Sequence, residues 1–284
     1  MVFSSLVFLY LFLPFIIITY FLSPKFFRNT LLLIASLFFY AWGEPKYVFL
    51  MLISIAVNYV MGIVIDRTPP SAKKKRLLIL TIIVNLAILG YYKYAGFFVG
   101  IWEDLFHVTI EFEEVRLPIG ISFYTFQAIS YIIDVYRQDV KAQRNLIDLS
   151  LFISLFPQLV AGPIVRYNTI AEQIKRRIIK NEDLMIGTRR FIQGLAKKVL
   201  IANPMGAVAD QCFSMSGDSL TTGAAWIGII AYSLQIYFDF SGYSDMAIGI
   251  ARIFGFKFLE NFNYPYVAQT VTEFWRRWHI SLSH

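Results

Sequence analysis

The segment KYVFLMLISIAVNYVMGIVI, residues 46–65, carries a single charged residue, Lys46, at its first position. A helix needs roughly 20 mostly apolar residues to cross a bilayer, because each residue adds about 1.5 Å. Further apolar segments cover residues 2–22, 30–42, 77–101, 117–136, 146–165 and 222–254. These runs are continuous rather than alternating, so the sequence predicts an all-α, polytopic integral membrane protein with about seven to eight membrane segments, and not a β-barrel.

The composition supports a membrane protein: 57% of the residues are hydrophobic and 16% are charged, whereas soluble domains have about 25% charged residues. The first segment has neither a basic start nor a small-residue cleavage site, which indicates a retained span and not a signal peptide. The single cysteine, Cys212, excludes an intrachain disulfide. Because the connections are short and no repeat is visible, residues 1–284 are predicted to form one membrane domain.

The net charge of +7 indicates basic loops beside an anionic cytoplasmic leaflet, and not nucleic-acid binding. The basic stretches 23–28, 67–76 and 137–144 are separated by pairs of apolar segments, so all three are expected on the cytoplasmic side. The acidic loop 103–116 then lies outside, and so does the N-terminus. The expected location is the bacterial cytoplasmic (inner) membrane.

The segment 146–165 does not fit this alternation, because basic loops flank it on both sides. Its centre reads FPQLVAGPI (156–164), and proline removes a backbone donor and bends a helix. Broken helices at membrane depth are tolerated only where protein or a wet cavity surrounds them. We expect a broken or re-entrant segment, with a kinked ordinary span as the alternative.

Charged residues interrupt the apolar pattern farther along the chain. Residues 184–202 contain two pairs of cations between apolar residues, which suits a helix at the membrane interface or at the mouth of a cavity. Asp239, Asp245 and Arg252 interrupt the apolar run 234–256, where Gly242 is expected to loosen the helix. Charges inside spans usually face the protein interior, so they predict either a polar channel or a network that joins helices.

Two polar residues of the segment 117–137 need their own explanation. Gln127 falls near the middle of the predicted span and needs a hydrogen-bonding partner. Asp134 falls near the predicted cytoplasmic end, where an ordinary position at the membrane interface explains it.

The chain closes with EFWRRWHISLSH, residues 273–284. Thr270 followed by Glu273 fits a capping box, which predicts a helix from Val271 with His279 in its third turn, on the same face as Trp275. The nearby cations would disfavour imidazolium and keep His279 neutral, as a general base requires. The alternative is a Trp/Arg anchor at the membrane interface with a structural histidine. His279 and His284 are five residues apart and cannot share a metal-ligand face, so no metal site is predicted.

Six stretches together resemble the membrane-bound O-acyltransferase family, most of all its bacterial branch that contains the membrane subunit of alginate O-acetylation. They are FFYAWGEPKY (38–47), PIGISFYTFQAISYIIDVYR (118–137), FPQLVAGPIVRY (156–167), QIYFDFSGYSDMAIGIARIFGF (235–256), NFNYPY (261–266) and FWRRWHISLS (274–283). They run in order along nearly the whole chain, so the similarity is specific.

The resemblance implies helices around a central funnel and transfer of an acyl group, acetyl above all, from a cytoplasmic thioester to an extracytoplasmic polysaccharide such as alginate. The donor would be acetyl-CoA or an acyl-carrier protein, with no tightly bound cofactor. Periplasmic or extracellular acyltransferase partners would finish the transfer, and membrane lipids surround the protein. By motif, His279 carries over as the first functional histidine, and the family's second histidine would lie downstream of a chain truncated at its C-terminus.

The residues that could line a substrate or donor channel are Trp275, Arg276, Arg277, Tyr237, Asp239 and Asp245. In this interpretation Arg276 and Arg277 line the cytoplasmic side of the tunnel. Three other functions stay open: D-alanyl transfer to teichoic acid, a transporter or flippase that carries an intermediate without chemistry, and a non-catalytic scaffold for a periplasmic enzyme. The lack of inverted repeats argues against the transporter.

Overall fold

The computed structural model describes residues 1–110, 112, 115–159, 162–215 and 220–283. Among these residues there is no β-strand, and one isolated antiparallel bridge joins Phe262 to Trp278. The predicted all-α class is therefore confirmed. The chain divides into two compact units, one formed by Met1–Leu22, Ala161–Val165 and Arg176–His284, the other by Ser23–Val160 and Arg166–Lys175.

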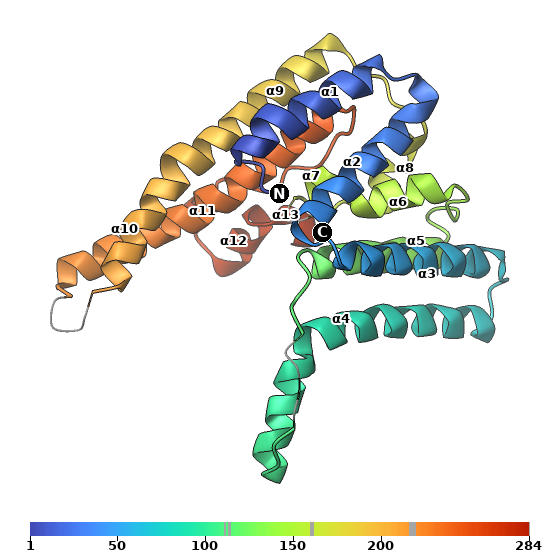
Figure 1. Ribbon diagram of the computed structural model, residues 1–284, viewed down its shortest axis with the longest axis horizontal. Coiled ribbons are helices and arrows are strands. Elements are labelled where there is room, and N and C mark those ends of the chain that lie inside the picture. Colours follow the sequence, from blue (N-terminus) through green and yellow to red (C-terminus); the bar gives the residue numbers. More distant parts are fainter. Residues whose placement is uncertain (111, 113–114, 160–161, 216–219, 284) are drawn as a thin grey trace. The chain divides into compact units, whose positions relative to one another are not determined.

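The second unit is built on α2 (Arg28–Gly43), α3 (Tyr47–Arg67), α4 (Ala72–Phe106) and α5 (Ile121–Arg137) (Figure 1). Within the described residues, three helices are long and apolar enough to cross a membrane, namely Lys25–Gly43, Tyr47–Arg67 and Ala72–Phe106. Phe8–Leu22 is a shorter apolar helix. The predicted number of seven to eight spans stays a prediction.

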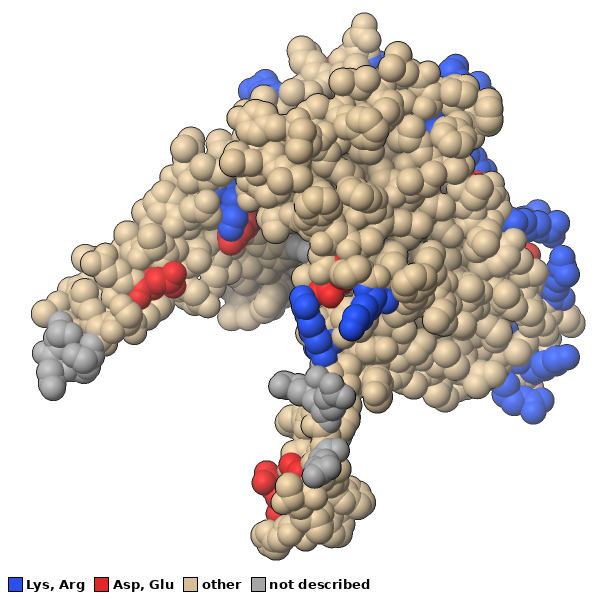
Figure 2. Space-filling view, viewed as in Figure 1, with Lys and Arg blue, Asp and Glu red and all other residues tan. Residues whose placement is uncertain are grey.

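Charge is distributed unevenly along α4. Figure 2 shows Lys and Arg side chains gathered over the turn from α3 to α4, and acidic side chains over the other end of α4. The basic end contains Lys73, Lys74, Lys75 and Arg76, and the acidic end contains Glu103 and Asp104. One long apolar helix thus joins the basic loop and the acidic loop that were predicted to lie on opposite sides of the membrane.

Two polar pairs hold the interior of this unit. Asn58 on α3 and Asn85 on α4 are both buried, and each side-chain amide donates to the other, at 2.9 and 3.0 Å. Glu44, at the end of α2, is buried and pairs with Arg116 at 3.3 Å. Buried polar groups are retained where their hydrogen bonds are made, so the asparagine pair fixes α3 against α4, and the second pair ties the end of α2 to the segment before α5.

The segment 146–165 is broken, as the sequence predicted. It forms α6 (Leu146–Ser154), an extended residue at Leu155, and α7 (Phe156–Leu159), followed within the same unit by α8 (Tyr167–Lys175). Pro157 explains the break, because its ring would clash with a carbonyl four residues earlier, whereas the first turn of α7 tolerates it. Val160 and Ala161, inside this segment, lie outside the described residues.

The two polar residues of α5 have different outcomes. Asp134 is buried, 7% exposed, so an ordinary position at the membrane interface was the wrong explanation. Gln127 is also buried, and its side-chain oxygen has no hydrogen-bonding partner among the described residues. The partner expected for that oxygen is therefore not found.

The first unit is dominated by two long antiparallel helical stretches that lie side by side (Figure 1). One is α9 (Asn181–Ala196), which continues through a π-helical stretch, Lys197–Ala202, into α10 (Asn203–Phe213); the other is α11 (Thr222–Ile253). The predicted helix over residues 184–202 is therefore present, but it is part of a longer element packed along α11.

Glycines let these two helices touch. A Cβ at Gly194 would lie 2.5 Å from the carbonyl oxygen of Gly242, and a Cβ at Gly249 would lie 2.6 Å from that of Gly187. On each helix the two glycines are seven residues apart, so they recur on one face at two-turn intervals. The expectation that Gly242 loosens α11 was wrong: the helix runs through this residue, which allows the backbones to approach closely.

The N-terminal part of the chain covers another face of α11. The helix α1 (Leu13–Leu22) ends near the end of α11, where the Tyr20 hydroxyl donates to the carbonyl of Phe254 at 3.1 Å. Nearer the N-terminus, the ring of Phe3 stacks on Tyr243 with centroids 4.5 Å apart. These contacts bury the middle of α11 on that side, so its remaining polar face is available for a site.

Candidate functional site

The first unit contains a cavity of about 820 Å³ beside α11. Its walls come from α9, the π-helical stretch, α11 and the segment that follows α11. The lining residues are Arg190, Gln193, Ala196, Lys197, Leu200, Ile201, Tyr237, Asp245, Glu260, Phe262, Asn263, Tyr264 and Ile280. Four charged residues, Arg190, Lys197, Asp245 and Glu260, lie in this lining beside aromatic and aliphatic side chains, and the volume is within the range of ligand sites.

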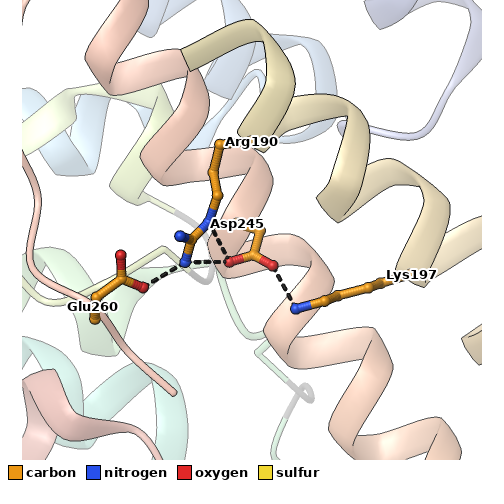
Figure 3. A network of polar contacts seen from close by, with 4 residues as sticks. All are labelled: Arg190, Lys197, Asp245 and Glu260. Carbon is orange, nitrogen blue, oxygen red and sulfur yellow. Dashed lines mark hydrogen bonds and ion pairs between the residues drawn. The ribbon is translucent and has the colours of Figure 1, made fainter. Parts of the chain in front are cut away.

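Asp245 is the centre of the polar network in this wall (Figure 3). One carboxylate oxygen accepts from the Arg190 guanidinium at 2.8 and 2.7 Å, and the other accepts from the Lys197 ammonium at 2.6 Å. Arg190 also pairs with Glu260. Asp245 is 6% exposed, so the two cations supply the charge partners that a buried carboxylate requires.

The glycine contacts explain why these groups meet. Gly194 and Gly242 bring the two backbones together, and Asp245 follows Gly242 by about one turn on α11. Arg190 and Lys197 lie one turn before and one turn after Gly194. Their long side chains therefore converge on the carboxylate from both sides.

Four further charged residues of this helix pair form two ion pairs and do not line the cavity. Asp239 pairs with Lys198 at 2.8 Å, and its side chain is 43% exposed. Arg252 donates to Asp183 at 3.2 Å. Asp245 and Arg252, seven residues apart on α11, thus have separate partners on α9 and its continuation. Tyr237 does line the cavity, with its ring against Phe262 and Tyr266.

The helix α12 (Val271–Arg277) begins where the sequence predicted. The Thr270 hydroxyl accepts from the Glu273 backbone N–H at 3.1 Å, but Glu273 reaches back to the backbone of Gln269, not of Thr270. The helix then ends at Arg277, so placing His279 in a third turn was wrong. His279 lies beyond the helix with a left-handed backbone, φ 48°.

His279 does not share a face with Trp275, contrary to the prediction. Its ring meets Phe240 of α11 edge to face, with centroids 4.9 Å apart, and Ile280 beside it lines the cavity. The imidazole Nε2 is buried and has no hydrogen-bonding partner among the described residues. Ile280 therefore lines the cavity, whereas His279 beside it is not a lining residue and keeps a buried, unpartnered Nε2 among the described residues.

Burial lowers the pKa of His279 from its ordinary value of 6.5. The direction agrees with the prediction of a neutral imidazole, but the cause differs, because desolvation and not the neighbouring arginines disfavours the charged form. Arg277 pairs with Glu273, one turn earlier on α12, at 2.8 Å. Arg276 is exposed and makes no ion pair among the described residues.

The structure thus brings two of the predicted channel residues, Tyr237 and Asp245, into one cavity wall. Trp275 is 53% exposed, and neither it nor Arg276 nor Arg277 is among the lining residues. His284 lies outside the described residues. The sequence interpretation gave Arg190 and Lys197 only as cations of a helix at the membrane interface or at the mouth of a cavity, and it missed Glu260. The signal for the two cations was available, because intramembrane carboxylates need partners and two pairs of cations occur on the preceding predicted helix.

Comparisons with known proteins converge on one family. The model of the membrane-bound O-acyltransferase family matches residues 136–284, a range that contains every residue of the cavity wall and His279. The whole chain is 49% identical to a probable alginate O-acetylase of Pseudomonas aeruginosa and covers 55% of that protein. It is 38% identical to a peptidoglycan O-acetyltransferase of Helicobacter pylori and covers 60% of it.

A more distant relative is named for the transfer of a different acyl group, D-alanyl. Over 58% of this chain and 42% of the relative, the sequence is 33% identical to a teichoic acid D-alanyltransferase of Bacillus subtilis. The chain spans about half to three fifths of the length of the alginate and peptidoglycan relatives.

Proposed function

Because the chain belongs to the membrane-bound O-acyltransferase family, we propose that the full-length protein is an enzyme that transfers an acetyl group to hydroxyls of an extracytoplasmic polysaccharide. The observation that carries the proposal is that His279 and the cavity of about 820 Å³ lie together inside the part that matches the family. The similarity over the full chain favours alginate or a related polymer as acceptor. D-alanyl transfer is the second candidate, supported by the shorter match to teichoic acid D-alanyltransferase.

The donor in this proposal is an acyl thioester, acetyl-CoA or an acyl-carrier protein, that reacts from the cytoplasmic side. It is a co-substrate, and no tightly bound cofactor is required. The cavity is large enough for a slender thioester arm. In the reaction the acceptor hydroxyl attacks the thioester carbonyl, the carbon–sulfur bond breaks, and the thiol leaves with a proton. In the cavity wall, Arg190 and Lys197 would offer the thioester arm hydrogen-bond donors, and Asp245 would offer it an acceptor.

His279 is proposed to accept the proton of the attacking hydroxyl or to orient that hydroxyl. A half-buried imidazole whose Nε2 has no hydrogen-bonding partner among the described residues supports this role, because a general base must be unprotonated and must not be committed to another hydrogen bond. Burial lowers its pKa from 6.5, so the base form predominates at neutral pH and is lost as the pH falls below that value. The rate of acetyl transfer is expected to fall along an acidic limb whose midpoint lies below 6.5.

We further propose a multi-pass protein of the bacterial inner membrane with its N-terminus outside. The support is the charge on α4, which is basic at the turn from α3 and acidic at its other end (Figure 2). Partner proteins in the periplasm would complete the transfer to the polymer. A cysteine label placed at Lys73 or at Glu103 in the full-length protein, tested with a membrane-impermeant maleimide in intact cells, separates the two sides. Labelling at Lys73 alone would contradict this orientation.

The experiment that tests the function is His279→Ala in the full-length protein, with acetyl incorporation into polymer as the measurement. His107→Ala is the matched control, because both histidines have a left-handed backbone, φ 48° and 52°, so the backbone cost is similar. His279→Ala should reduce covalent acetylation at least a hundredfold, the range of general-base catalysis, and the control should not. Normal acetylation with normal expression of His279→Ala would contradict the role. Labelled acetyl that crosses the membrane without covalent attachment would instead indicate a transporter.

A further inference from the structure

The turn that carries His279 is paired with the segment after α11. The backbone N–H of Asn263 donates to the carbonyl of Arg277 at 2.9 Å, and Phe262 forms the bridge with Trp278. In a regular antiparallel pairing Asn261 would next oppose His279 alone. Instead the N–H of Ile280 donates to the carbonyl of Asn261, at 3.0 Å. Two residues therefore oppose one, as in a β-bulge, and bulges re-aim a side chain.

The side chain of Asn261 makes a second connection to this turn. Its Oδ1 accepts from the backbone N–H of Ser281 at 3.2 Å and from the Ser281 hydroxyl at 2.9 Å. The acceptor must be the oxygen, because a backbone N–H can only donate. Asn261 is 1% exposed, so these bonds are shielded from water and losing them would leave buried donors unpaired.

The Ser281 hydroxyl extends the connection to a third segment. It accepts from the backbone N–H of Ile164, at 3.0 Å, while it donates to Asn261. Ile164 belongs to the short piece Ala161–Val165 that clusters with this unit. The residue after Ile280 is thus fixed from two sides, and its position depends on Asn261.

The backbone of His279 has a conformation that the hydrogen bonds of its neighbours must maintain. Its φ of 48° is in the left-handed region, which is unfavourable for a residue with a side chain and persists only where the surrounding structure imposes it. The conformation presents the ring to Phe240 and leaves Nε2 without a partner among the described residues. The side-chain hydrogen bonds that maintain the turn are made by Asn261 and Ser281, and the imidazole Nε2 takes no part in them.

We propose that Asn261 is a positioning residue, whose side chain and carbonyl hold Ile280 and Ser281 and thereby fix the ring of His279, with its unpartnered Nε2, next to the residues that line the cavity. The consequence for acyl transfer rests on the proposed function of His279. Asn261 acts on the orientation of the histidine and not on the binding of the donor, which occupies a wall that Asn261 does not line.

The first test measures the histidine directly and needs no activity. The full-length protein in detergent is treated with diethylpyrocarbonate, and mass spectrometry follows modification of His279 against His107 as internal reference. Asn261→Leu should release the turn and expose the buried Nε2 of His279, so that the modification rate of His279 rises several-fold and that of His107 does not change. Asn261→Asp keeps an acceptor oxygen for Ser281 and should restore the wild-type rate. Asn58→Leu removes a buried asparagine of the other unit and should leave the rate unchanged.

The second test uses acetyl transfer from labelled acetyl-CoA to polymer in membranes that contain the full-length protein, supplied with the periplasmic partner proteins that the proposed function requires. Asn261→Leu should lower kcat about tenfold or more with KM for the donor unchanged, since a small misplacement of a catalytic group has large effects. Ser281→Ala should lower kcat in the same sense but by less, because the backbone bond from Ser281 to Asn261 remains. A rise in KM with kcat unchanged would overturn the inference.

The two tests separate the inference from the proposed function. If the wild-type protein transfers no acetyl group while Asn261→Leu still alters modification of His279, the proposed function fails and the positioning role stands. If acetyl transfer occurs but modification of His279 is the same in wild type and Asn261→Leu, the proposed function stands and the positioning role is overturned.

Discussion

Two helix pairs in this protein are joined by buried polar groups in opposite ways. In α3 and α4, two neutral side chains, Asn58 and Asn85, hydrogen-bond to each other and to their own helices, so the pair is closed. In α9 and α11, a buried carboxylate, Asp245, takes two cations that are each about one-third exposed, and the network borders a cavity.

The neutral pair serves to hold two helices together, whereas the charged network also forms the wall of a site. A reciprocal amide pair needs no net charge and no water, so it suits helices long and apolar enough to cross a bilayer. A charge network is costly to bury and is retained where a wet or ligand-filled space is useful. The α9–α11 pair therefore needs another source of close contact, and the glycine faces supply it.

The largest effect on stability should come from adding a methyl group at the glycine contact between α9 and α11. Gly194→Ala would place a methyl group 2.5 Å from the carbonyl oxygen of Gly242 and 2.7 Å from the backbone nitrogen of Met246, and backbone atoms cannot rotate away. We expect the free energy of unfolding to fall by about 3 kcal/mol, the upper part of the overpacking range. Thermal unfolding of the full-length protein in detergent measures it. Gly96→Ala on α4, with nothing within 4 Å of the added Cβ, should be neutral or stabilising.

The next effect should come from removing the central carboxylate. Asp245→Ala leaves Arg190 and Lys197 without their shared partner, and because both cations are about one-third exposed, water offsets part of the loss. A decrease of about 2 kcal/mol in unfolding free energy is expected, below the range for fully buried pairs. Adding Lys197→Met to Asp245→Ala should recover part of it in the same denaturation experiment. No recovery would mean that the carboxylate stabilises the fold in another way.

The sequence predicts a structural feature well when the residues that cause it are close together in the chain. The start of α12 was predictable, because Thr270 and Glu273 are three residues apart and interact within one turn. The end of α12 was not, because the chain leaves the helix to pair with Asn263, which is 14 residues before Arg277. His279 was therefore identified by its motif but misplaced in space.

The same limit applies to the helix pairs. Pro157 predicted a break in the segment 146–165 because a proline acts on its own turn. Gly242 was misjudged, since its role depends on Gly194 of another helix. Asp239 and Asp245 were recognised as residues that need explanation, but only the three-dimensional register shows that Lys198 and Arg190 are among their partners.

A smaller effect is expected at the neutral pair. Asn58→Leu leaves the side-chain amide of Asn85 without its reciprocal partner but keeps its bond to the carbonyl of Thr81. The unfolding free energy should fall by about 1 kcal/mol, typical of a hydrogen bond between helices in a membrane protein. The double variant Asn58→Leu with Asn85→Leu should regain much of this in thermal denaturation, because no unpaired amide then remains. If the double variant is less stable than either single variant, Asn58 and Asn85 do not satisfy each other as a reciprocal pair.

The smallest effect should come from Asp239→Asn, which tests whether exposure and not charge alone sets the strength of the ion pairs. Asp239 pairs with Lys198 at 2.8 Å, a length close to that of the Asp245 pairs, but its side chain is 43% exposed and that of Asp245 is 9% exposed. Water screens the exposed pair, so the cost should be about 0.5 kcal/mol or less and should vanish as salt is raised to about 1 M, where the screening length is about 3 Å. The cost of Asp245→Ala should persist in the same salt series, because the carboxylate is buried. Equal salt dependence of the two variants in thermal denaturation would show that the cavity wall around Asp245 is as open to water as the pair at Asp239.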